Sequence, residues 1–162
     1  MKRTLSTKGL VITGMIAALY GVLTLPFGQI ACGPIQFRIA ELLTLLPFFT
    51  PWAIPGVTLG CLISNLLFST PWDALFGTLA TLLAAWFTAR SKHKLVAVLW
   101  PILLNGLIIG TMLTYMIGTV AWLPWLTMVG EVTASELVVC GILGLPLMGI
   151  IEKFNLQRMF KS

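Results

Sequence analysis

The sequence predicts an all-α membrane protein, a compact bundle of six transmembrane helices. Hydrophobic residues make up 58% of the 162 residues and charged residues only 9%, whereas ordinary soluble domains carry about 25% charged residues. The mean hydropathy is +0.99. Little sequence separates the apolar segments, so we expect residues 1–162 to form a single integral membrane domain.

The first three helices follow from the apolar runs and the prolines that end them. The first is expected at about 9–27, and we interpret it as a retained helix because it lacks a small-residue cleavage pattern and leads straight into more membrane sequence. The second, at about 37–50, is short, since 14 residues rise only about 21 Å. The third is expected at about 56–68, after the TPWAIP link.

The remaining three helices are expected at about 71–89, 96–117 and 128–151. The motif STPWD begins the fourth helix with a capping Ser69 or Thr70 and a proline in the first turn. A basic loop, RSKHK, follows that helix, and the aromatic-rich GTVAWLPWL is interpreted as a link before the sixth. The tail after it is polar and amphipathic.

The basic residues indicate which way the bundle faces. With six spans both termini lie on one side, and nine of the ten basic residues then map to that side: Lys2, Arg3, Lys8, Arg90, Lys92, Lys94, Lys153, Arg158 and Lys161. The positive-inside rule makes this side cytoplasmic. The net charge of +5 is therefore a topology signal, and nucleic acid is not an expected partner.

Polar residues gather instead in the outer half of the predicted bundle. They are Gln36, Arg38, Glu41, Asn65, Trp72, Asp73, Glu131 and Glu136. An Asp, Lys or Arg at a helix centre costs about 2.5 to 3.5 kcal/mol apiece. Several such groups at one depth need a shared reason, and a polar ligand pocket open to the outside supplies it.

Each of these residues also has a purely structural interpretation. Arg38 and Glu41 share a helix face and could neutralise each other, although the Gly-Pro loop beside them favours a cavity. Asp73 could merely favour the positive N-terminus of its helix. Glu136, about two turns inside the last helix, is hardest to explain without a ligand. For Asn105, hydrogen bonding between helices is the favoured interpretation.

Small residues indicate close helix packing. The first helix carries Gly14, Ala17, Ala18 and Gly21 at small-xxx-small spacing, so one of its two pairs could face another subunit. Gly106 and Gly110 predict tight packing of the fifth helix within the bundle.

The chain shows no motif for chemistry of its own. It has no Walker motif, no metal-binding His cluster and no nucleophile with a base, so no catalytic residue, metal or cofactor is expected. The three cysteines, Cys32, Cys61 and Cys140, are far apart and are interpreted as core-filling thiols.

Four stretches, at 33–51, 53–67, 71–85 and 135–147, resemble the QueT family. Those proteins are queuosine-precursor transporters, substrate-binding S components of energy-coupling-factor (ECF) transporters. The resemblance implies a six-helix S-component fold in the cell membrane of a prokaryote, with a site near the extracytoplasmic side. It also implies a transmembrane T component, contacted by the small residues of the first helix, and two separate ATPase subunits that power uptake.

The resemblance carries substrate-binding roles onto Gln36, Arg38, Glu41, Asn65, Asp73 and Glu136, and an outer tryptophan such as Trp72 could stack on the ligand. Ser135, where the family usually has glycine, and the extra Glu131 bear on the substrate of this member. The implied ligand is a nucleobase-like 7-deazaguanine, in its 7-cyano or 7-aminomethyl form. Our hypothesis is that Glu136 or Glu41 accepts its N1–H and 2-amino group while Arg38 or Gln36 donates to its carbonyl. Asp73 or Glu41 would pair with an aminomethyl group.

Three alternatives stay open from the sequence. The chain could be an S component for another vitamin-like heterocycle. It could be a structural or assembly membrane protein whose charges only lock helices together. An intramembrane enzyme ranks third, for lack of a nucleophile with a base.

Overall fold

The computed structural model describes residues 7–27, 37–119, 121–156 and 158, and this part of the chain is helical and without strands. Three helices are long and apolar enough to cross a membrane: α1 (Thr7–Thr24), α5 (Lys94–Met116) and the continuous helix Trp122–Lys153. The last consists of α6 (Trp122–Glu136), the π-helical η4 (Leu137–Leu143) and α7 (Gly144–Lys153).

Three shorter apolar segments complete the bundle. They are the 3₁₀ helix η2 (Ile39–Phe48), α3 (Ala53–Phe68), and the π-helical η3 (Asp73–Gly77) continued by α4 (Thr78–Thr88). A single 3₁₀ turn, η1 (Leu25–Phe27), follows α1. Six helical segments therefore appear near the six predicted positions, and their apolar character indicates a membrane protein.

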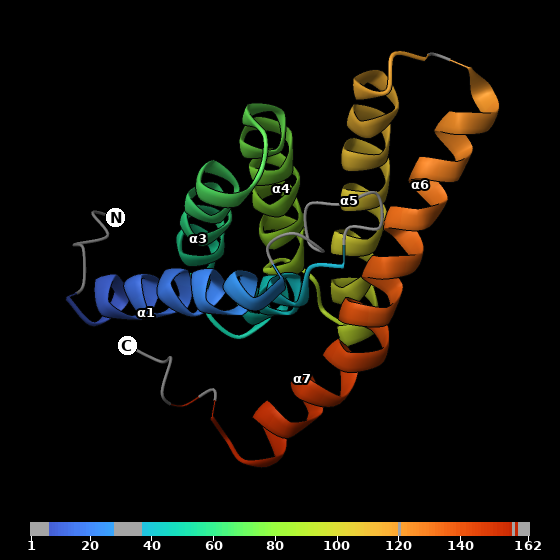
Figure 1. Cartoon of the computed structure of the whole chain (residues 1–162). Helices are drawn as coiled ribbons and strands as arrows, with labels where there is room; N and C mark the ends of the chain where they lie inside the picture. Colours follow the sequence, from blue (N-terminus) through green and yellow to red (C-terminus); the bar gives the residue numbers. More distant parts are fainter. Residues whose placement is uncertain (1–6, 28–36, 120, 157, 159–162) are drawn as a thin grey trace.

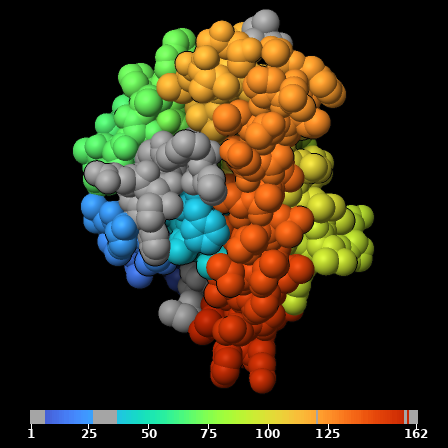
Figure 2. Space-filling view, turned by 45° about the vertical axis from the view of Figure 1, so that its right-hand side comes forward, coloured from blue at the N-terminus to red at the C-terminus, as the bar shows by residue number. Residues whose placement is uncertain are grey.

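The short η2 lies at the centre of the fold. It contacts α1, α3, α4, α5, η4 and α7. In Figure 1, α5 and α6 form one side of the molecule and α1 and α3 the other, with α4 between them. Figure 2 shows the long α6–α7 helix crossing one whole face, with η2 in cyan beside it. Whatever η2 carries is consequently surrounded by helices.

Glycines let the neighbouring helices approach closely. A Cβ placed at Gly60 of α3 would lie 2.6 Å from the Tyr20 Cβ on α1, and one at Gly110 of α5 would lie 2.6 Å from the Val129 Cα on α6. Both distances are too short for a real side chain, so these helix pairs depend on glycine. The predicted role of Gly106 and Gly110 in tight packing is confirmed, since Gly106 abuts Thr133 of α6 in the same way.

The segment predicted as an α-helix over 37–50 is instead the 3₁₀ helix Ile39–Phe48. Pro47 has no N–H and cannot donate the bond that an α-helix needs there. The Thr44 hydroxyl donates to the Glu41 carbonyl at 2.6 Å, and the Cys140 thiol donates to the same oxygen at 3.5 Å. The Glu41 carbonyl, which in an α-helix would accept from a backbone N–H four residues later, is therefore bonded by side chains instead.

The predicted starts of two other helices are also wrong. The last helix begins at Trp122 rather than 128, so most of the expected aromatic link is helical. Similarly, α3 begins at Ala53 rather than 56. In both cases a proline, Pro124 or Pro55, had suggested a break, yet each lies in the first helical turn, where its missing N–H costs nothing.

Contacts join segments that are far apart in the sequence. Ile12 near the start of α1, Ala53 at the start of α3 and Ile151 near the end of α7 belong to one core cluster. A salt bridge joins Lys94, the first residue of α5, to Glu152 of α7. The start of α5 and the end of α7 therefore lie together.

Candidate functional site

Five polar residues singled out in the sequence come together in the interior. Arg38, Glu41, Asn65, Asp73 and Glu136 are 7%, 0%, 4%, 3% and 3% exposed. They come from η2, α3, η3 and α6, so four segments converge. Since buried polar groups are costly unless they are hydrogen-bonded, their contacts show how each is held.

One half of this group is centred on Arg38, immediately before η2. Its Nη2 lies 3.1 Å from Asp73 Oδ1, and its Nη1 donates to Asn65 Oδ1 at 3.3 Å. Asn65 in turn donates from Nδ2 to the Asp73 carbonyl at 3.0 Å. The hydroxyls of Ser69 and Thr70 donate to Asp73 Oδ2. We call Arg38, Asn65 and Asp73 the ion-pair cluster.

Glu41 lies deeper, on η2. Its Oε1 accepts hydrogen bonds from the Tyr20 hydroxyl at 2.6 Å and the Thr81 hydroxyl at 3.0 Å. Asn65 donates from Nδ2 to the Cys61 sulfur at 3.3 Å, and the Thr81 hydroxyl oxygen lies 3.4 Å from the same sulfur. Cys61 thus connects the ion-pair cluster to Glu41, whose bonds reach α1 and α4.

Glu136 meets Glu41 on its other side. Asn105 of α5 donates from Nδ2 to Glu136 Oε1 at 2.8 Å, which confirms the predicted interhelical role of Asn105. Cys140 Sγ lies 3.4 Å from Glu136 Oε2 and 3.5 Å from the Glu41 carbonyl. The two acidic residues therefore flank one thiol. We call Glu41, Asn105 and Glu136 the acceptor cluster.

The three buried carboxylates share an unusual backbone setting. Glu41 lies in a 3₁₀ helix, Asp73 is the first residue of the π-helical η3, and Glu136 immediately precedes the π-helical η4. Short π-helical segments occur frequently at functional sites. This pattern marks the same region as the buried contacts, independently of them.

Sequence reasoning missed Tyr20, Thr81 and the part played by Cys61 and Cys140. Thr81 could have been found, because it lies two turns beyond Asp73 on the stripe that includes Gly77. Nothing in the sequence marks Tyr20 as part of the polar network, since only its hydroxyl distinguishes it from an apolar aromatic residue of the core. The two cysteines are free and buried, as their interpretation as core thiols requires.

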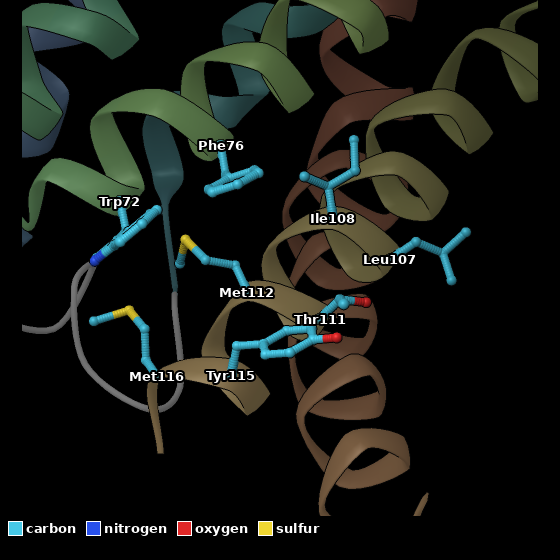
Figure 3. Close-up of a pocket in the computed structure, with 8 residues that line it drawn as sticks. All are labelled: Trp72, Phe76, Leu107, Ile108, Thr111, Met112, Tyr115 and Met116. Carbon is cyan, nitrogen blue, oxygen red and sulfur yellow. The ribbon is translucent and has the colours of Figure 1, made fainter. Parts of the chain in front are cut away.

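Trp72 lines an apolar groove of about 720 Å³ between η3 and α5, and no residue of the two clusters lines this groove. Figure 3 shows Trp72 and Phe76 on one side of this groove, with Met112, Met116 and Tyr115 of α5 opposite. Trp72 is 56% exposed, and its ring stacks on Phe76 with centroids 6.0 Å apart. Its predicted stacking role would therefore be exercised in the groove.

A smaller hollow of about 230 Å³ adjoins the groove through Thr111 and Tyr115. Trp122 and Trp125 line it, stacked on each other at 5.0 Å. The groove and this hollow together present an aromatic surface at the α5–α6 end that is remote from the Lys94–Glu152 salt bridge.

The other predicted residues are distributed as follows. Gln36 lies outside the described residues. On α1, Gly14 and Ala18 are exposed and Ala17 is half-buried; a Cβ placed at Gly14 or Gly21 would have no neighbour within 4 Å. Among the described side chains, no group of three His, Cys, Asp or Glu is placed to hold a metal ion.

Comparison with known proteins agrees with the predicted resemblance. The sequence model of the family described as "QueT transporter" matches residues 10–153. A curated relative, the queuosine precursor transporter QueT of Lactococcus lactis subsp. cremoris (strain MG1363), is 44% identical over 84 residues. That match covers 51% of this chain and 49% of the relative, so it spans about half of each. No solved structure matches the chain. Both the family and the relative are transporters rather than enzymes, and the chain belongs to the QueT transporter family.

Proposed function

We propose that this protein is the substrate-binding membrane subunit, or S component, of an ECF-type ABC transporter. In this role it captures a queuosine precursor, a 7-deazaguanine in the 7-cyano or 7-aminomethyl form, from outside the cell for ATP-driven uptake. The family membership and the curated relative's printed name support transport of such a precursor.

The single observation that carries the proposal is the buried polar network. Three carboxylates, one guanidinium and two amides meet inside an apolar bundle, in the part that the structure describes. Buried ionisable residues in membrane segments mark substrate pathways by default, because their insertion is costly. A polar, planar base with several N–H groups suits such a site.

The exposed small residues of α1 support a partner in the membrane. Gly14 and Ala18 are not used for packing within the described chain, and small residues let another helix approach closely. We assign this face to the T component. ATP hydrolysis then belongs to two partner ATPase subunits, since the sequence carries no Walker motif.

The positive-inside rule sets the proposed orientation. The bundle end with Lys94 and the basic loop faces the cytoplasm, and both termini lie there. The opposite end, with Trp72 and Trp122, faces outward in the cell membrane of a prokaryote. The ligand would then arrive from the side on which the aromatic groove lies.

Direct binding tests the proposal. We expect purified protein to bind 7-cyano- or 7-aminomethyl-7-deazaguanine at micromolar concentration or better by isothermal titration calorimetry. Cells that contain this protein with a T component and two ATPases should accumulate the base, and an ATPase-dead partner should abolish uptake. If neither base binds while another vitamin-like heterocycle does, the substrate assignment fails.

One observation favours a structural alternative for part of the network. The Arg38–Asp73 ion pair joins two segments within the described chain, and Arg38 also donates to Asn65, as a helix-locking group would. A purely structural protein should bind none of the ligands in a heterocycle panel. Alanine at Glu41 or Glu136 would then only reduce folding.

A further inference from the structure

Two buried oxygen atoms in the acceptor cluster have no hydrogen-bond partner in the part of the chain that the structure describes. They are Glu41 Oε2 and Asn105 Oδ1, and both residues are 0% exposed. An unsatisfied buried acceptor is costly, and in a native protein it needs an explanation. Here two of them occur in the acceptor cluster, in which the Cys140 thiol lies between Glu136 Oε2 and the main-chain carbonyl of Glu41.

The amide of Asn105 has a defined orientation. Its Nδ2 lies 2.8 Å from Glu136 Oε1; when Glu136 is ionised its oxygens only accept, so the amide nitrogen then faces Glu136. The carbonyl oxygen of Asn105 is consequently the atom left over. Rotating the amide would place two acceptors against each other.

The described donors recorded on the Glu41 carboxylate both reach its other oxygen. The Tyr20 and Thr81 hydroxyls both donate to Glu41 Oε1. The Cys140 thiol lies between Glu136 Oε2 and the Glu41 carbonyl. The described surroundings therefore leave Glu41 Oε2 and Asn105 Oδ1 unsatisfied, and a partner for these oxygens must bring N–H or O–H donors.

The ion-pair cluster is different. Asp73 accepts from Arg38 at one oxygen and from two hydroxyls at the other, and both ends of the Asn65 amide are bonded. Gly77 packs directly against it: a Cβ there would lie 3.0 Å from Asn65 Nδ2 and 3.3 Å from Arg38 Nη1. This half is bonded and closely packed, which suits a lock between helices.

We propose that the acceptor cluster reads the donor edge of the ligand, with Glu41 and Asn105 as its specificity-determining residues. This inference rests on the proposed function and assigns an edge of its ligand. A 7-deazaguanine presents N1–H and a 2-amino group side by side, and a carboxylate can accept from both together. Such paired contacts discriminate between bases by roughly 5- to 150-fold in affinity. Arg38, Asn65 and Asp73 hold the helices in place.

The wild-type protein alone gives the first test. Affinities are measured by calorimetry for 7-aminomethyl-7-deazaguanine, for its analogue without the 2-amino group, and for 7-deazaadenine, whose N1 is an acceptor. We expect the analogue to bind at least about tenfold more weakly and 7-deazaadenine not to bind. These measurements do not depend on any variant folding.

Variants then locate the contact. Glu41→Gln replaces an acceptor with a donor at nearly constant volume, and Asn105→Leu removes the acceptor. Each should weaken binding at least about tenfold and reduce the preference for the 2-amino group. Thr88→Val is the matched control, because Thr88 is buried and its hydroxyl donates to the Ala97 carbonyl at 3.0 Å, outside the polar network. It should leave affinity unchanged.

The outcomes separate the two proposals. If wild type binds 7-deazaguanines but neither loss of the 2-amino group nor Glu41→Gln changes affinity by more than about twofold, the acceptor cluster does not read that edge and the proposed function stands. If wild type binds no 7-deazaguanine, the proposed function fails and this inference with it.

Discussion

The hydroxyl of Tyr20 donates to Glu41 Oε1 at 2.6 Å, joining α1 to the centre of the polar network. Tyr20 is 2% exposed, and α1 presents Gly14 and Ala18 on its exposed face. One helix therefore carries both a contact to the buried carboxylate and the proposed partner surface. Movement of α1 against a partner would therefore change the hydrogen bond between Tyr20 and Glu41.

Tyr20→Phe removes that donor and keeps the ring. We expect a loss of about 1.5 to 3 kcal/mol in the free energy of unfolding, the range for a hydrogen bond to a charged group. Denaturant unfolding in detergent measures it. Tyr115→Phe is the control, because Tyr115 is 68% exposed. Equal stability of the two variants would show that the Tyr20–Glu41 bond contributes nothing.

Breaking the Arg38–Asp73 pair should be more damaging than losing a surface pair. Arg38→Met leaves Asp73 buried without its cation, which we expect to cost about 3 to 5 kcal/mol. Arg38→Met combined with Asp73→Asn should recover part of that loss, as a double-mutant cycle on melting temperature would show. The comparison pair is Lys94–Glu152, whose side chains are 32% and 39% exposed; Lys94→Met should cost at most about 1 kcal/mol. If the double variant is no more stable than Arg38→Met alone, Arg38 and Asp73 are not directly coupled.

Gly110→Ala should separate α5 from α6. The new Cβ would lie 2.6 Å from the Val129 backbone, which cannot move aside cheaply, and overpacking of this kind costs about 1 to 3 kcal/mol. Gly130→Ala on α6 is the matched change, since it has no neighbour within 4 Å and alanine favours a helix. Thermal unfolding should show a lower midpoint for Gly110→Ala and an unchanged or higher one for Gly130→Ala.

The proposed orientation can be read by cysteine labelling. In a Cys32→Ser background the other two cysteines, Cys61 and Cys140, are buried. A membrane-impermeant maleimide added to intact cells should label Ala121→Cys, whereas Lys92→Cys should react only after permeabilisation. Both positions are exposed in the structure. The reverse pattern would place the basic loop outside and overturn the orientation.

Gly14→Trp tests the partner face of α1. Because a Cβ placed at Gly14 meets no atom of another described segment within 4 Å, the variant should fold and bind ligand normally but fail to copurify with the T component and ATPases. Leu67→Trp on α3 also adds bulk to an exposed position, 68% exposed in the wild type, and should still assemble. Normal assembly of Gly14→Trp would move the partner contact elsewhere.

The sequence grouped five of the polar residues that meet in the interior, together with Trp72, which lines a separate groove, but it did not predict how the five pair. Their similar predicted depth in the membrane was enough to group Arg38, Asp73 and Glu136, because charged residues inside apolar segments pair with other polar groups. Arg38 and Glu41 looked like partners from their spacing, yet the recorded ion pair of Arg38 runs across helices to Asp73. Spacing along one helix predicts local neighbours only, and partners on other helices follow from packing.

The irregular backbone segments could likewise not be predicted from the sequence pattern. Apolar periodicity cannot distinguish an α-turn from the π-helical segments at Asp73–Gly77 and Leu137–Leu143, because hydrophobic residues surround both. Pro55 and Pro124 led to the prediction of non-helical links, but both lie in the first turn of a helix. Their effect depends on position within a helix, which a single sequence does not fix.

The 32-residue helix Trp122–Lys153 has a consequence for the lipid environment of this protein. At 1.5 Å per residue it is about 48 Å long, whereas a hydrocarbon core is about 30 Å thick. Such hydrophobic mismatch is relieved by tilting or by thickening the bilayer. Since Glu136 lies on this helix, bilayer thickness sets the depth and angle of a carboxylate in the network. Ligand affinity should therefore vary with the acyl-chain length of the surrounding lipid.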